Sequence, residues 1–196
     1  MSEQRMWSRW PLLLAVVTML GCASGRASKV TYHDPNMDFS LAQTVAVLPF
    51  ANLTPNPNAA DRTRDVFMTM LQAGGGLYVL PPGEVARGSA RANVANPIAP
   101  TSEEAVALAK IVQADVVITG TVLEYGEVRS GSTSSNVISV SLKMLEAQSG
   151  KVVWTASSTQ GGVTASARLF GGGGQPMDEV TEKAVEDLLD KLFKKK

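Results

Sequence analysis

Short runs of apolar residues recur along the chain, separated by polar segments with a different period. Residues 44–50 (TVAVLPF) and 77–80 (LYVL) are such runs, and a proline stands in or directly after each. Brief apolar, β-branched runs bounded by turn residues predict buried strands. Between them, residues 59–73 place Val66, Phe67, Met70 and Leu71 on one side of a helix. This period predicts an amphipathic helix that ends at the glycines that follow it.

The middle of the chain contains a clear helix start and two further strand patterns. Thr101 and Glu104 have the spacing of a capping box, which predicts a helix at 102–113. Residues 115–123 (DVVITGTVL) are the strongest strand pattern in the chain. Residues 137–145 alternate between apolar and polar, and this alternation predicts a strand with one face in solvent.

The remaining elements complete the prediction of the fold. Ser149 and Gly150 predict a tight turn into a strand at 151–155, which makes a hairpin with strand 137–145. A polar loop is expected at 129–135, and a last helix from about Met177. One short helix is expected near 85–92 in a weakly patterned stretch. The strand–helix order β-α-β-α-β-β-β-α predicts a single α/β domain with a mixed sheet and flanking helices.

The first residues carry a different signal. Arg5 and Arg9 precede an uncharged apolar run at 11–20 (PLLLAVVTML), and small residues follow. A positive start, a short apolar middle and a small-residue cleavage zone indicate a bacterial secretory signal peptide at 1–21. A retained spanning helix is the alternative, but it needs ~20 apolar residues to cross the bilayer.

Cys22 is the single cysteine of the chain and stands directly after this run. It cannot form an intrachain disulfide, so it could be a nucleophile, a buried thiol or a site of modification. Residues 19–22 (MLGC) resemble the lipobox of bacterial lipoproteins, which implies cleavage before Cys22 and its lipidation. Residues 22–43 are then the lipid anchor and a tether, and 44–196 the folded domain. Ala23 is not the Asp that often marks inner-membrane retention, so the resemblance favours the outer membrane.

Composition narrows the classes of function. The chain carries 18 Lys and Arg against 18 Asp and Glu, and 44% of its residues are apolar. Without an excess of basic residues there is no electrostatic support for a nucleic-acid partner. Stability has to come from packing, because no disulfide can form within the domain.

The residues that could support catalysis or metal binding do not form a recognisable set. His33 is the only histidine, and with Asp34 and Asp38 it falls in the predicted tether. A metal site usually needs further nitrogen or sulfur ligands, and a catalytic triad needs a positioned histidine. Glu124 and Glu127 are expected to follow a strand end and to face solvent. We therefore expect no enzymatic activity, no metal and no cofactor.

Two glycine-containing motifs have simpler interpretations than phosphate binding. Residues 149–151 (SGK) lack the earlier glycine and the following hydroxyl of a P-loop, so a hairpin turn is favoured. The four glycines 171–174 precede a helix but lack a lysine, so a surface loop is favoured. Residues 194–196 are lysines that complement the negative end of a helix, with a membrane-binding basic patch as the alternative.

Residues 163–169 (VTASARL) alternate apolar and polar between two glycine-rich segments. A free edge strand of this kind can pair with another chain. A subunit contact made by this segment and a mobile surface loop remain equal alternatives.

Three segments together resemble the CsgG-type superfamily of bacterial envelope lipoproteins: 46–54 (AVLPFANLT), 114–126 (ADVVITGTVLEYG) and 140–157 (VSLKMLEAQSGKVVWTAS). The superfamily includes a curli export channel, exopolysaccharide-export lipoproteins, activators of peptidoglycan synthases and small neisserial lipoproteins. The resemblance covers roughly residues 44–193 and implies a fold similar to the N-terminal domain of TolB. It also implies a non-enzymatic, often oligomeric, periplasmic module.

These observations lead to one expected function and one alternative. We expect a lipid-anchored accessory component of an outer-membrane export or assembly machine, located on the periplasmic face of the outer membrane. Its expected partners are the membrane, through lipidated Cys22, further copies of the chain, and envelope export or cell-wall proteins. The alternative is a regulator that binds and activates a peptidoglycan synthase.

Overall fold

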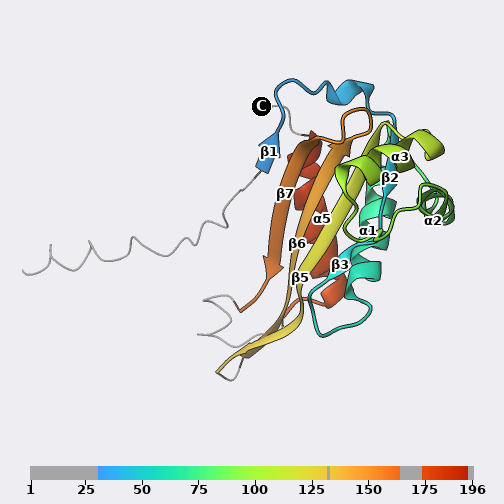
Figure 1. Cartoon of the computed structure of the whole chain (residues 1–196). Coiled ribbons are helices and arrows are strands. Elements are labelled where there is room, and N and C mark those ends of the chain that lie inside the picture. The colour runs from blue at the N-terminus through green and yellow to red at the C-terminus, as the bar shows by residue number, and fades with distance from the viewer. Residues whose placement is uncertain (1–30, 132, 164–173, 194–196) are drawn as a thin grey trace, which may run out of the picture.

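Among the residues that the structure describes, seven strands form one mixed sheet in the order β1-β7-β6-β5-β2-β4, with β3 beside β5 (Figure 1). The computed structural model describes residues 31–131, 133–163 and 174–193. The strands are β1 (Thr31–His33), β2 (Thr44–Val47), β3 (Ala51–Asn52), β4 (Tyr78–Val79), β5 (Val116–Ser130), β6 (Thr133–Glu146) and β7 (Val152–Gly161). The helices are α1 (Ala59–Ala73), α2 (Pro82–Arg91), α3 (Ser102–Val112), α5 (Met177–Phe193) and a 3₁₀ turn, η2 (Phe39–Leu41).

The two halves of the sheet are connected differently. β2 runs parallel to β4 and β5, whereas β5, β6, β7 and β1 are antiparallel neighbours. Parallel neighbours require a crossover, which α1 provides between β2 and β4, while antiparallel neighbours need only a turn. The predicted fold class, a single α/β domain with a mixed sheet and flanking helices, is confirmed.

β2 contributes to two hydrophobic cores. Val45 and Val47 belong to the core under α1 and α5, while Ala46 and Leu48 belong to the core under α2 and α3. Successive residues of a strand point to opposite faces, so a strand buried on both faces has to be apolar throughout. This explains the unbroken apolar run at 44–50. The first core also contains Phe67, Ile118, Leu142, Trp154 and Leu188, and the second contains Leu80, Val85, Leu108 and Val117.

β6 has the predicted solvent-facing side. Its inward residues Ile138, Val140, Leu142 and Met144 are buried, whereas Ser141 is partly exposed and Lys143 exposed. Figure 1 shows α5 behind this part of the sheet and α2 and α3 beside β2, so the front of β6 and β7 stays in view.

The expected tether at 22–43 is too long at its C-terminal end. Thr31–His33 form β1, which pairs with β7 from Thr31 opposite Ala156 to His33 opposite Trp154. Three residues that pair through the backbone have no periodic side-chain pattern, so the sequence could not separate them from a tether. Residues 22–30 lie outside the described part of the chain.

The expected polar loop at 129–135 is also wrong, because β5 and β6 continue as a long hairpin. Their last pair is Ser130 with Thr133, well beyond the end of β7, whose Gly161 pairs with Val137. We call the two-stranded extension, residues 127–136, the arm; it projects at one end of the sheet (Figure 1). Its buried side chains, Thr133 and Ser135, are polar rather than apolar, which is why its sequence is typical of a loop.

Candidate functional site

The segment before β2 is attached to the end of α5 by His33. Its Nε2 lies 2.8 Å from the carbonyl oxygen of Lys191, and its ring contacts Phe39 edge to face at 5.4 Å between centroids. Because a carbonyl can only accept, Nε2 must carry the proton. From the same helix, Nζ of Lys191 donates to the carbonyl of Ser157 in β7 at 2.7 Å. We call this group of contacts the β1 clamp; it holds the end of β1 against the C-terminal end of α5.

The carboxylates near His33 stabilise turns. Asp34 accepts from the backbone N–H of Asn36 at 2.9 Å, and Asp38 caps η2 by accepting from the N–H of Ser40 at 3.0 Å. Within the described residues, no group of three or more His, Cys, Asp or Glu side chains is arranged to hold a metal ion.

The motif at 149–151 is a hairpin turn in the structure, as predicted. Gly150 has φ of +68°, a conformation that favours glycine. A Cβ at this position would lie 2.9 Å from the carbonyl oxygen of Ser102, so the turn packs closely on the start of α3. The other Gly-rich motif lies mostly outside the described residues, and so does most of the predicted edge strand at 163–169.

Glu124 and Glu127 do not follow the end of a strand, which corrects the expectation from the sequence. Both lie within β5, Glu124 on the part that leads to the arm and Glu127 in the arm itself, and both are exposed as expected. The hydroxyl of Ser134 on the facing strand and the guanidinium of Arg129, 3.5 Å away, lower the pKa of Glu127. This carboxylate therefore stays charged and joins the two strands.

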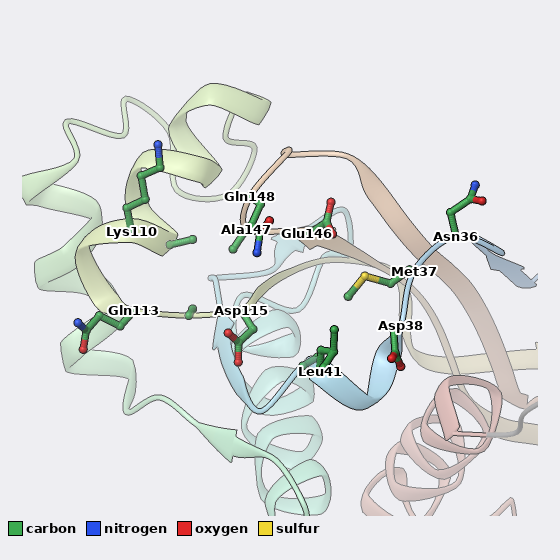
Figure 2. A pocket seen from close by; sticks show the side chains of 13 residues that line it. Asn36, Met37, Asp38, Leu41, Lys110, Gln113, Asp115, Glu146, Ala147 and Gln148 are labelled. Carbon is green, nitrogen blue, oxygen red and sulfur yellow. The ribbon is translucent and has the colours of Figure 1, made fainter.

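A groove of about 550 Å³ lies at the end of the sheet opposite the arm. It is bordered by the segment before β2, the end of α3 and the turn after β6. Figure 2 shows Met37 and Leu41 entering it from the segment before β2, with Asp115 and Glu146 at its border.

The groove's carboxylates already have partners within the chain. Oδ2 of Asp115 accepts from the backbone N–H groups of Gln43 and Thr44 at 2.9 and 2.8 Å. Glu146 accepts from the hydroxyl of Ser149. These bonds hold the start of β2 and the turn after β6 in place. The two carboxylates therefore stabilise the walls of the groove.

No pattern in the sequence indicated the β1 clamp or the role of Asp115. His33 bonds to a residue 158 positions away, and Asp115 to residues 72 and 71 positions away. The predicted lipidation site Cys22 lies outside the described residues, and its role stays a prediction. In the described part of the chain, the helices are too short or too polar to cross a bilayer.

Comparisons with known proteins show one matching family and several solved structures with a similar fold. A family model described as "Putative lipoprotein GNA1162-like" matches residues 35–193. A dodecamer of a PelC variant from Paraburkholderia phytofirmans is similar, with 23% identity, a TM-score of 0.57, and coverage of 83% of this chain and 96% of that one. The lipoprotein GNA1162 from Neisseria meningitidis is also similar, with 18% identity, a TM-score of 0.55, and coverage of 76% and 97%. These likenesses show the shared fold. No curated protein sequence gives a significant match.

Proposed function

Because the chain belongs to the GNA1162-like lipoprotein family, we propose that it is a lipid-anchored, self-assembling scaffold of a bacterial envelope export or assembly machine. The observation that carries this proposal is the position of β1 relative to Cys22. Thr31, which pairs with β7, stands nine positions after the cysteine.

The proposed anchor is a lipidated Cys22 after removal of residues 1–21. Acyl chains contribute ~0.8 kcal/mol per buried CH₂, and stable anchoring takes more than one chain. Nine residues span at most ~30 Å when fully extended, so the domain would lie directly beside the membrane. We place it on the periplasmic face of the outer membrane, since Ala23 is not an inner-membrane retention signal.

The short connection argues against a regulator that reaches across the cell wall. The chain from Cys22 to Thr31 spans at most ~30 Å, less than half of the greatest span of the 22-residue tether predicted from the sequence. A protein held so close to the bilayer suits a machine that is built at the membrane itself. We propose that it works there by binding and assembly rather than by catalysis.

Self-assembly is proposed from the fold and from the surfaces that it leaves open. A protein with this fold forms a dodecamer. Here, the segments on either side of 164–173 both bond to Asn136 at the base of the arm: Gly162 N–H donates to its carbonyl, and its Nδ2 donates to the carbonyl of Gln175, each at 2.8 Å. The described residues on both sides of the predicted edge strand therefore lie beside the arm, and we propose that this segment pairs there with a second copy. Deleting 161–174 should change the native mass, and an unchanged mass would remove this segment from the interface.

The anchoring step is tested by replacing Cys22 with serine. The full-length protein should partition into the membrane fraction of cells, and Cys22→Ser should release it or leave it with an uncleaved leader. Ser24→Ala, two residues away, is the matched control and should leave the membrane partitioning unchanged. Unchanged lipid labelling of the Cys22→Ser variant would refute the anchor.

A further inference from the structure

The side of the sheet that faces away from α5 is lined with hydroxyl groups. Ile118, Leu142 and Ala156 point into the core under α1 and α5, so the residues that alternate with them in β5, β6 and β7 lie on the other side. These partly exposed residues are Thr119, Thr121, Ser139, Ser141, Thr155 and Ser157. With Lys143, which alternates in the same way, we call them the hydroxyl face. Figure 1 shows α5 behind β6 and β7, on the side opposite this face.

Strand register joins these residues into one surface. Ser141 lies opposite Thr121 of β5 on one side and opposite Ser157 of β7 on the other. In the next row along β6, the hydroxyl oxygens of Ser139 and Thr159 lie 2.9 Å apart. Cross-strand neighbours have Cβ atoms ~4.5–5.5 Å apart, so the rows form a continuous patch across β5, β6 and β7.

Lys143 gives this patch a positive charge. It is exposed and lies opposite Thr119 and Thr155, while Glu124, opposite Ser139, borders the patch at its arm end. Lysine and hydroxyl side chains all donate hydrogen bonds, so the hydroxyl face suits a partner that carries many acceptors. An antiparallel sheet can also leave one face in water, so the open face alone does not identify that partner.

The outer side of α5 carries acceptors in a single row. Exposed carboxylates follow one another there at every fourth position: Asp178, Glu182, Glu186 and Asp190. We call these residues the carboxylate row. Residues four apart lie on one side of a helix, and like charges at this spacing destabilise it. Lys183, on the same helix, pairs with Glu179 at 2.8 Å. Donors from another molecule would therefore stabilise the carboxylate row.

The carboxylate row and the hydroxyl face occupy the same length of the sheet, on opposite sides of it. α5 contacts β7 at Gly161, where an added Cβ would come within 2.9 Å of Val180. It contacts β7 again at Ser157, whose carbonyl accepts from Nζ of Lys191 at 2.7 Å. Between these contacts β7 pairs with residues 137–141 of β6. The middle of the carboxylate row therefore lies behind the middle of the hydroxyl face.

We propose that the hydroxyl face of one copy of the chain docks on the carboxylate row of a second copy. Lys143 then lies against Glu186, and the hydroxyls beside it donate to the neighbouring carboxylates. Hydrogen bonds to an ionised acceptor are roughly twice as strong as those between neutral groups. This inference rests on the proposed self-assembly and identifies the surfaces that make it.

The arrangement explains how many copies can assemble through one contact. Its two surfaces lie on opposite faces of the sheet, so every copy that uses one surface keeps the other for the next neighbour. Such head-to-tail contacts form a ring when the rotation between neighbours closes. Rotation about an axis parallel to the strands keeps Lys143 level with the carboxylate row, because both surfaces cover the same length of the sheet. The contact does not involve the segment 161–174.

Zero-length cross-linking of the full-length protein in detergent tests the contact. A carbodiimide joins an amine to a carboxylate that touches it. Within one copy the sheet separates Lys143 from the outer side of α5, so a link between Lys143 and the carboxylate row has to join two copies. We expect this link, to Glu186 or Asp190, in the assembled protein, located by mass spectrometry. An intact assembly without it would overturn this contact and leave the proposed self-assembly standing.

Charge reversal tests whether the contact holds the copies together. Lys143→Glu places like charges face to face and should raise the concentration at half-assembly about tenfold or more. Glu186→Lys should do the same. Joined in one chain, the two changes restore the opposite charges and should return this concentration to within about threefold of the original. Lys151→Glu, in the exposed turn after β6, is the matched control and should change it less than about threefold.

Light scattering measures the assembly, and thermal melts verify that each variant remains folded. Equal losses in Lys143→Glu and Lys151→Glu, or no recovery in the double variant, would overturn the contact. If the unaltered chain stays a monomer at all concentrations, this contact and the proposed self-assembly both fail.

Discussion

Removing the His33 side chain should loosen β1 without unfolding the domain. His33→Ala deletes the bond to the Lys191 carbonyl and the ring contact with Phe39. A hydrogen bond contributes ~1 kcal/mol and an aromatic pair ~0.5–1.5 kcal/mol, so the clamp loses ~1.5–2.5 kcal/mol. Since β1 is a three-residue edge strand, this loss should appear as local opening rather than as a large drop in global stability.

Hydrogen–deuterium exchange measures this opening directly. Exchange in peptides that cover residues 31–34 should speed up by about 10- to 70-fold, because each ~1.4 kcal/mol is a factor of ten. One reporter is the N–H of Asp34, which bonds to the carbonyl of Val153 at 2.8 Å. Tyr32→Ala is the matched control, because this neighbouring side chain is 47% exposed and should alter exchange by less than about threefold. Unchanged exchange in His33→Ala, or an equal change in both variants, would refute the β1 clamp.

Two further predictions concern the helices over the second core. A Cβ at Gly88 would overlap Cγ1 of Val112, so overpacking in Gly88→Ala should destabilise the folded domain by ~1–3 kcal/mol. The better helix propensity of alanine should offset ~1 kcal/mol of this loss. A Cβ at Gly83 in the same helix would meet only Nη1 of Arg87, at an ordinary contact distance of 3.5 Å, so Gly83→Ala should stabilise by ~0.5–1 kcal/mol. Denaturant melts that ranked the two variants alike would contradict the packing. Backbone N–H groups of Ala95 and Thr101 lower the pKa of Glu104 from 4.5, so its contribution is present above pH 4.5 and is lost as pH falls through the lowered pKa. Glu104→Gln should therefore reduce the loss of stability between pH 6 and pH 3, and an unchanged acid profile would count against this effect.

Local signals in the sequence predicted the elements that depend on neighbouring residues. Both hydrogen bonds of the predicted capping box are present: the side chains of Thr101 and Glu104 each bond to the backbone N–H of the other residue. The helix at 59–73 and the turn at Gly150 also agree, because helix periodicity and glycine conformation are set within a few residues.

The misses have a common physical cause, which is dependence on distant backbone. β1 is defined by hydrogen bonds to β7 more than 100 positions away, and the arm by strand pairing in which the buried residues, Thr133 and Ser135, are polar. Neither leaves a pattern of apolar residues in Thr31–His33 or Glu127–Asn136.

The candidate site was predictable only in part. Cys22 could be proposed because signal peptides and lipoboxes are linear motifs, whereas the β1 clamp joins His33 to Lys191 at the far end of the chain. The predicted resemblance to small neisserial lipoproteins agrees with the match to the GNA1162-like family. The wider CsgG-type label stays a prediction.

The native mass of the full-length protein, extracted in detergent and measured by light scattering, tests the central claim most directly. A scaffold that builds an export or assembly machine should appear as one discrete assembly of many copies, and deleting 161–174 should break it into smaller species. A monomer at all concentrations would contradict self-assembly and leave a lipid-tethered adaptor in its place.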